Sequence, residues 1–389
     1  MKNLLISLIV VFTLISCNQN LQIENSNPLK DSLIGDWEPL PFIPNDSGKY
    51  IFIPPPGVTR GYSFSKDSID FFIGLFDFKT DTSPRGRTIK YLGNFKHYKL
   101  DQNKLSTKNS ETGKWEEFWT IKEIKNDTLF LAEKDGNSNK LKRIKHKDSF
   151  EDFDKIIYSS IGCYGTCPIL NVSLDRSRNV LFYGEAFVKS IGFHKGKIEQ
   201  KYTDFIFKKF EKANVKSLEA EYIAGHTDDQ SITTTFLRDG KIIKSVYDYG
   251  RQAPKELLWA YVPISNIFDS HKLLKVNEKE ELPKVKLLDF SIGEKKLQLL
   301  KSEGFYLWTE LLKSNKTESK FKEIYSLSFE NYRQKNEANP TIKITSDGRY
   351  FKFKSKEKIT TYDLGYNFIG KNFKKSDIKK VEEYKLPNS

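Results

Sequence analysis

The sequence predicts a multidomain α+β protein in which an N-terminal, antiparallel β-barrel-like domain is followed by two α+β domains. Three observations lead to this prediction. Over residues 31–146, short runs of alternating apolar and polar residues are separated by Gly, Pro, Asn and Asp, as in a meander or small barrel. In residues 151–272 and again in 286–386, strand-like runs are mixed with amphipathic, helix-like runs. The charged, polar residues 273–285 between these two regions are expected to form a linker.

The composition is typical of a folded chain. Hydrophobic residues make up 38% and aromatic residues 14% of the 389 residues, enough for two or three domains with their own cores. The net charge is +13, but only ten of the 64 basic residues are arginine, the residue preferred for bidentate contacts to phosphate and bases. The lysines are scattered among acidic residues. We therefore expect no nucleic-acid partner, while a weak attraction to anionic lipid or polysaccharide stays open.

The first 16 residues have the pattern of a secretory signal peptide. Lys2 supplies a positive charge, residues 4–15 are largely apolar, and Ser16 is small. The apolar run is shorter than the roughly 20 residues that a transmembrane helix needs. We expect residues 1–16 to be removed on export.

The end of this segment, Leu14-Ile15-Ser16-Cys17, resembles the lipobox of bacterial lipoproteins. The resemblance implies cleavage before Cys17 and a diacylglyceryl group on its thiol, which with a further acyl chain gives a stable membrane anchor. An ordinary secretory signal that contains a cysteine is the alternative. We expect residues 17–30 to be a lipidated, polar tether and the protein to be held by lipid in the cell envelope, at the periplasmic or surface face of the outer membrane.

The N-terminal domain, residues 31–146, contains strand-like runs at short intervals. These runs are residues 32–37, 50–53, 62–64, 69–73, 118–124 and 128–131. The opening Gly35-Asp36-Trp37 and a closing strand pair of the form W-x-I and L-x-L resemble the lipocalin-like domains of bacterial lipoproteins. The resemblance implies an eight-stranded barrel with room for a small apolar ligand. A barrel filled by its own side chains is the alternative.

The middle region, residues 151–272, combines strands with two helical stretches. Strands are predicted at residues 156–160, 169–174, 180–184, 231–237 and 241–246, the last two joined by the hairpin turn 238–240. Thr203-Asp204 is expected to cap an amphipathic stretch that reaches Leu218 and forms one or two helices. Pro254 is expected to lie in the first turn of another helix.

The last region, residues 286–386, has a similar make-up. A helix is predicted near residues 305–312, and strands at residues 325–329, 341–344 and 350–353. The turn at residues 345–349 is similar to the one at residues 238–240. We expect the last two domains to share a topology, although no repeated motif connects them.

Residues 159–168 are the most distinctive stretch and contain Cys163, Gly165, Cys167 and Pro168. With the Tyr183-Gly184, Thr227-Asp228-Asp229 and Tyr247-Asp248 segments, this stretch resembles an uncharacterised domain-of-unknown-function family of bacterial lipoproteins that carries a C-x-G-x-C-P signature. The resemblance covers residues 151–272 and implies a domain identity but no activity.

Three interpretations of this cysteine pair stay open. In a structural disulfide, Gly165 would permit the tight turn that brings the Cα atoms from about 13 Å, as in an extended strand, to within ~7 Å. The second interpretation is a reduced, buried pair or one that changes redox state. The third is a metal site, because C-x-x-x-C-P also resembles the copper-binding motif of Sco-type chaperones, with His226 or His194 as a further ligand.

His226, Asp228 and Asp229 are weak ligand candidates, and the alternative is a polar turn in which the aspartates cap backbone amides. The sequence contains no G-x-S-x-G, Walker or dinucleotide-binding motif. We therefore assign no catalytic residue, metal site or cofactor.

The function that the sequence favours is a non-catalytic binding or structural module of the envelope. Its expected partners are membrane lipid through the anchor and either an envelope protein or a small apolar ligand. One alternative is a lipoprotein that binds a small molecule or a copper-like metal, in the barrel or at the turn between Cys163 and Cys167. Another is a hydrolase without a recognisable motif.

Overall fold

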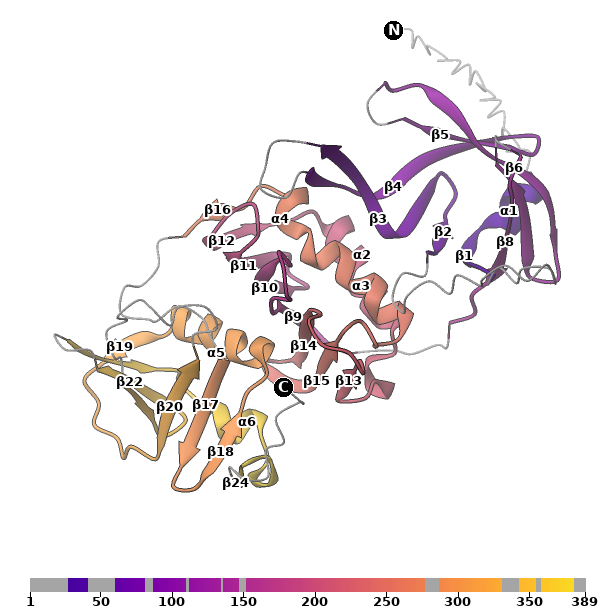
Figure 1. Cartoon of the computed structure of the whole chain (residues 1–389). Helices are drawn as coiled ribbons and strands as arrows, with labels where there is room; N and C mark the ends of the chain where they lie inside the picture. Colours follow the sequence, from indigo (N-terminus) through magenta and orange to yellow (C-terminus); the bar gives the residue numbers. More distant parts are fainter. Residues whose placement is uncertain are drawn as a thin grey trace, which may run out of the picture.

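The computed structural model of the chain describes residues 27–40, 60–80, 87–109, 112–133, 136–146, 152–276, 287–330, 343–354 and 358–380. The predicted signal peptide, Cys17 and the strand predicted at residues 50–53 lie outside these residues. The described elements form a closed β-barrel followed by two eight-stranded sheets with helices between them (Figure 1). The predicted α+β class with a barrel at its N-terminal end is confirmed.

The barrel consists of eight strands that pair in chain order and close between the first and the last. They are β1 (Gly35–Pro39), β2 (Tyr62–Phe64), β3 (Ser68–Thr80), β4 (Arg87–Asp101), β5 (Lys104–Lys108), β6 (Trp115–Lys125), β7 (Thr128–Ala132) and β8 (Ser138–Arg143). Helix α1 (Pro28–Leu33) precedes them, where the sequence predicts the end of the tether and the start of a strand. It forms because Pro28 suits the first helical position and the Asn27 side chain accepts from the Leu29 and Lys30 amides.

Aromatic and aliphatic side chains of the barrel fill its core. Trp37 is fully buried and donates from Nε1 to the Leu33 carbonyl at 2.8 Å. The Tyr62 ring lies edge-on to Phe71 and Trp119, with ring centroids 5.5 and 5.0 Å apart. Among the described residues, these side chains pack against one another inside the barrel, as expected for a barrel filled by its own side chains.

The second unit, which we call the middle domain, is built on a sheet that we call sheet B. Its strand order is β13-β15-β14-β9-β10-β11-β12-β16. The strands are β9 (Lys155–Ser160), β10 (Ile169–Asp175), β11 (Asn179–Ala186), β12 (Gly192–Lys197), β13 (Glu221–Ile223), β14 (Ser231–Arg238), β15 (Lys241–Tyr249) and β16 (Leu274–Lys275), and the helices are α2 (Gln200–Lys212), η1 (Val215–Ser217), α3 (Lys255–Ser265) and α4 (Ile267–Ser270).

The start of α2 and the strand β16 are among the details of the middle domain that differ from the sequence prediction. Helix α2 begins at Gln200, before the predicted Thr203-Asp204 cap, because Thr203 is buried inside the helix and its hydroxyl donates to the Glu199 carbonyl at 3.2 Å. The start of the predicted linker forms β16, which pairs with β12 and is the edge strand on that side of sheet B.

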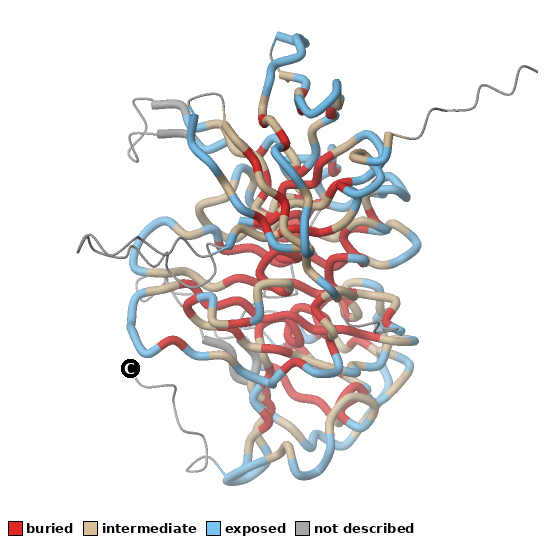
Figure 2. The backbone as a smooth tube through the Cα atoms, turned by 90° about the vertical axis from the view of Figure 1, so that its right-hand side faces the viewer, coloured by how far each residue is buried: buried red, intermediate tan, exposed pale blue. Residues whose placement is uncertain are grey.

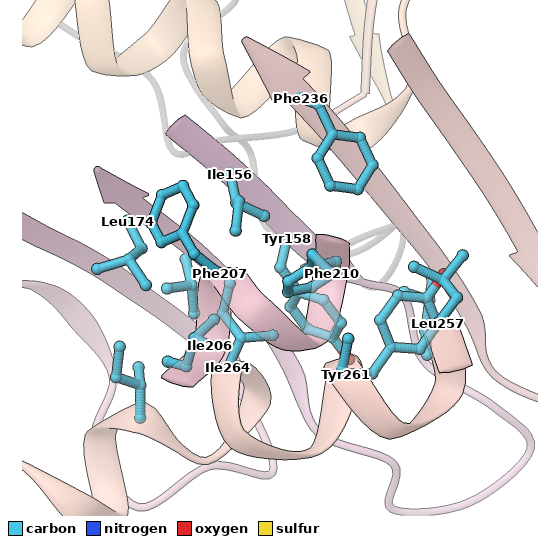
Figure 3. Close-up of a cluster of buried hydrophobic side chains, with 14 of the residues drawn as sticks. Ile156, Tyr158, Leu174, Ile206, Phe207, Phe210, Phe236, Leu257, Tyr261 and Ile264 are labelled. Atoms are coloured by element: carbon cyan, nitrogen blue, oxygen red, sulfur yellow. The ribbon is translucent and has the colours of Figure 1, made fainter. Parts of the chain in front are cut away.

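Helices α2 and α3 cover one face of sheet B. Phe207 and Phe210 from α2 and Tyr261 from α3 pack on Ile156 and Tyr158 of β9 (Figure 3). The neighbouring β9 residue Ile157 points to the other face and belongs to a different core cluster. Because both faces of sheet B are covered, its central strands are buried along almost their whole length.

The third unit is built on a sheet that we call sheet C, with strand order β19-β23-β22-β21-β20-β17-β18-β24. The strands are β17 (Leu287–Ile292), β18 (Lys295–Gln298), β19 (Asn315–Thr317), β20 (Tyr325–Glu330), β21 (Lys343–Ser346), β22 (Tyr350–Lys354), β23 (Ile359–Asp363) and β24 (Lys379–Lys380), and the helices are α5 (Lys301–Lys313), α6 (Phe368–Asn372) and η2 (Lys375–Asp377).

Sheets B and C follow the same winding rule. In each, the strands before the first helix run in chain order, the strand after that helix lies at the opposite edge, and the last strand pairs with the remaining edge. They differ in that four strands precede the helix in sheet B and two in sheet C.

Helix α5 lies between the two sheets (Figure 1). Phe305 and Leu307 from α5 share a buried cluster with Ile157 of sheet B and Phe290 of sheet C. Buried segments accordingly run through the centre of the molecule, and exposed ones lie at its margin (Figure 2). No helix within the described residues is both long and apolar enough to cross a membrane.

Candidate functional site

A pocket of about 380 Å³ lies where the barrel meets the middle domain. Ile73 and Phe76 of barrel strand β3 form one side, and residues of α3 that include Trp259 form another. Strands β9, β10 and β14 supply Tyr158, Leu170 and Ile232 (Tyr158 is labelled in Figure 3), and further lining residues are Ser160, Pro168, Gln230, Arg251, Leu258, Tyr261, Val262, Ser265 and Asn266. The volume and the mixture of apolar and polar groups are typical of small-molecule sites.

The close approach of the barrel to α3 depends on Gly74. This residue has φ of +75°, and a Cβ atom on it would lie 2.9 Å from the Tyr91 ring and 3.0 Å from a methyl group of Val262. Only glycine fits such a position without displacing its neighbours. Gly74 thereby places Phe76, two residues later, against the pocket.

The connection between β9 and β10 forms another wall. Cys163 and Cys167 are joined in a disulfide with their Cα atoms 5.6 Å apart, so the disulfide that the sequence favoured among the three interpretations is present. Gly165 makes the tight turn with φ of +153°, and its amide donates to the Cys163 carbonyl at 2.8 Å. The Pro168 carbonyl accepts from Ser160 Oγ at 2.8 Å and from Gln230 Nε2 at 2.9 Å. These two hydrogen bonds therefore hold the disulfide loop against the lining residues Ser160 and Gln230.

The other predicted site residues lie outside the pocket lining. His226 Nε2 is 3.1 Å from Asp229 Oδ2, and both side chains are exposed. Burial alone would raise the pKa of Asp229, but hydrogen bonds from the Gln230 amide and from His226 hold it below its usual value. The Asp228 carbonyl accepts from the amide of Tyr164, in the disulfide loop, at 3.2 Å. The three predicted residues thus form a surface turn beside that loop.

The structure does not bring the predicted metal ligands together. His194 lies on β12, three strands from β9, and its Nε2 is 3.0 Å from Ser190 Oγ. Both cysteine sulfurs are used in the disulfide. Among the described residues, no three or more His, Cys, Asp or Glu side chains are placed to hold a metal ion.

Arg251 reaches the pocket from the turn between β15 and α3. Gly250 and Arg251 have φ values of +71° and +58°. The Asp248 carboxylate stabilises this turn. Its Oδ1 accepts hydrogen bonds from the Gln252 amide at 2.8 Å and from the Ala253 amide at 3.2 Å. Eight further non-glycine residues in the described part of the chain have a left-handed backbone, so this conformation defines the turn but does not by itself mark a site.

Burial sets the protonation of the groups near the pocket floor. It raises the pKa values of Tyr158 and Tyr261 above the usual tyrosine range, so both hydroxyls stay protonated at neutral pH. Burial also raises the pKa of Asp248 to about 6. Within the described residues, Asp248 Oδ2 and the Tyr261 hydroxyl are buried without a hydrogen-bond partner.

Residues 154–268 match the family model of a domain of unknown function (DUF6438). A DUF6438 domain thus forms the middle of the chain. The prediction of a domain of unknown function in this region is confirmed, while the lipobox and the C-x-G-x-C-P signature stay predictions. No curated protein matches the chain. An H. pylori β clamp in complex with 5-chloroisatin aligns over 78% of this chain and 89% of its own at 8% identity, and its TM-score of 0.14 carries no argument.

The DUF6438 domain holds the barrel through buried charges. Asp70 of β3 is 2.7 Å from Lys209 of α2, and both side chains are less than one-tenth exposed. Burial alone would raise the pKa of Asp36, but the hydrogen bond from His146 and the charge of Lys212 lower it below its usual value. The barrel and the helices are also joined by the ion pairs Asp36–Lys212 and Glu38–Lys255.

Sequence reasoning singled out Pro168, and with it the stretch that contains Ser160, but missed most of the residues that line the pocket. Phe76, Trp259 and Arg251 are ordinary parts of a strand, a helix and a turn, and no spacing connects them. The resemblance to a domain-of-unknown-function family included the Tyr247-Asp248 segment, three residues before Arg251. Of the segments that carry this resemblance, this one alone lies next in the sequence to the turn that carries Arg251.

Proposed function

We propose that this chain is a lipid-anchored envelope protein that binds a small, partly apolar molecule between its barrel and its DUF6438 domain. The observation that carries the proposal is the pocket of about 380 Å³ built from both domains. Small-molecule sites commonly lie at domain junctions and combine apolar walls with a few polar groups. Phe76 and Trp259 supply apolar surface, and Gln230 and Asn266 supply polar groups.

The chemistry of the lining supports binding in preference to catalysis. None of the fifteen residues that line the pocket is a carboxylate, a histidine or a cysteine. General acid–base catalysis near neutral pH most often uses such groups. The one lining residue near the disulfide with a nucleophilic hydroxyl, Ser160, donates to the Pro168 carbonyl and accepts from the Leu170 amide.

Export and lipid attachment at Cys17 are supported by the signal-like N-terminus and by the disulfide, which fits an oxidising compartment. In cells grown with an alkyne-tagged palmitate analogue, we expect the full chain to incorporate the label and Cys17→Ser to lose it, because the acceptor thiol is gone. The double variant Cys163→Ser/Cys167→Ser is the control and is expected to keep the label. Label on Cys17→Ser would refute lipid attachment at this residue.

Binding in the pocket can be tested with 8-anilinonaphthalene-1-sulfonate (ANS), a fluorescent aromatic anion. We use residues 18–389, which include every described residue. Ile73→Trp places an indole on the barrel side of the pocket and is expected to weaken ANS binding about tenfold, or 1.4 kcal/mol. Ile243→Trp, at an exposed position of β15 outside the pocket, is the matched control and is expected to bind as the wild type does. Equal ANS affinities in all three proteins, or no binding to any, would overturn the proposed pocket function.

A further inference from the structure

Arg251 is the one charged side chain among the fifteen residues that line the pocket. The others are apolar, aromatic or polar without charge. A single cation in such a lining favours a ligand with an anionic group, because an ion leaves water readily only when an opposite charge receives it.

The Arg251 guanidinium has no partner within the described part of the chain. It forms no ion pair or hydrogen bond there, although its charge opposes the rise that burial gives to the pKa values of Asp229 and Asp248. Both carboxylates have other contacts. Asp229 lies against His226 and accepts from the Gln230 amide, and Asp248 Oδ1 accepts from two backbone amides. The Arg251 side chain is exposed, so the guanidinium is accessible to a group from outside the chain.

The turn that carries Arg251 is fixed and not a loose loop. Arg251 keeps a left-handed backbone at φ of +58°, and the Asp248 carboxylate holds the two amides that follow it. Such a conformation persists where the surrounding structure determines it. A fixed guanidinium loses less freedom when it pairs with a planar anion than a loose one would.

The rest of the lining indicates what the anion is attached to. Phe76, Trp259 and Tyr261 offer aromatic surface in a pocket of about 380 Å³. We infer that the pocket selects small amphipathic anions, an aromatic or short acyl group with a carboxylate or similar charge, and that Arg251 pairs with that charge. This inference rests on the proposed function and specifies its ligand.

The test compares ANS with N-phenyl-1-naphthylamine, which has the same ring system without the sulfonate. For residues 18–389 we expect ANS to bind about tenfold more tightly, or 1.4 kcal/mol. Arg251→Gln is expected to remove this preference and leave the affinity for the neutral probe unchanged, and Arg251→Lys to keep part of it. Octanoate should displace ANS at concentrations where 1-octanol does not.

The matched control is Arg178→Gln. Arg178 also has a left-handed backbone, with φ of +75°, but lies in the turn between β10 and β11, away from the pocket lining. It is expected to keep the preference for ANS. Equal binding of the two probes to the wild type, or a preference that survives in Arg251→Gln, would refute the anion selectivity and leave the pocket function standing. If neither probe binds, both the anion selectivity and the proposed pocket function are refuted.

Discussion

Lys209→Met is expected to lower the free energy of unfolding by about 3–5 kcal/mol, because it leaves the Asp70 carboxyl group buried without its partner. The two groups are 2.7 Å apart between β3 and α2, and both side chains are less than one-tenth exposed. Asp70 Oδ1 has no hydrogen-bond partner in the described structure, so after the substitution the charge of Lys212 acts on the carboxyl group without a hydrogen bond. Burial raises the pKa of Asp70, and the Lys209 charge opposes that rise. Urea unfolding followed by tryptophan fluorescence measures the change.

Two further variants separate the ion pair from the general effect of losing a lysine. Lys208 is the preceding residue on α2 and is exposed, so Lys208→Met is expected to change the free energy of unfolding by less than about 0.5 kcal/mol. The double variant Asp70→Leu/Lys209→Met removes both charges and should recover most of the loss. If Lys209→Met unfolds at the same urea concentration as Lys208→Met, the pair does not hold the barrel to the DUF6438 domain.

Local sequence patterns predicted those parts of the fold that depend on neighbouring residues. Asp239 and Gly240 form the predicted hairpin because both adopt left-handed backbones, with φ of +51° and +66°. The disulfide could also be predicted from neighbouring residues, because Gly165 permits a tight turn between Cys163 and Cys167. Strand β12 was missed because its sequence, from Gly192 to Lys197, is mostly polar and glycine-rich.

The pocket depends on contacts that no local pattern records. Its walls come from β3, from the loop after β9 and from α3, which are separated by long stretches of other structure. Because both faces of sheet B are covered, its central strands are continuous runs of apolar or small residues. Such runs do not indicate which face of the sheet lies toward the barrel. The sequence left two alternatives for the barrel, a small apolar ligand or an interior filled by its own side chains, and the rings of Tyr62, Phe71 and Trp119 pack together there.

Asp248→Asn is expected to change how stability depends on pH. Burial raises the Asp248 pKa from 3.8 to about 6, so between these values the folded protein binds more protons than the unfolded chain. Stability from this group is therefore present below pH 4 and is lost as pH rises through 6. Because one pKa unit corresponds to about 1.4 kcal/mol, the loss is about 3 kcal/mol. Asparagine still has an oxygen for the Gln252 and Ala253 amides but does not ionise.

The quantity to measure is the difference in free energy of unfolding between Asp248→Asn and the wild type, by urea titration at several pH values. We expect this difference to shift by about 2.5 kcal/mol in favour of the variant between pH 4 and pH 7. Asp228→Asn, at an exposed turn, serves as the control and should run parallel to the wild type. A constant difference across this pH range would mean that the Asp248 carboxyl group reaches water in the folded protein, and the fixed turn that presents Arg251 to the pocket would lose its support.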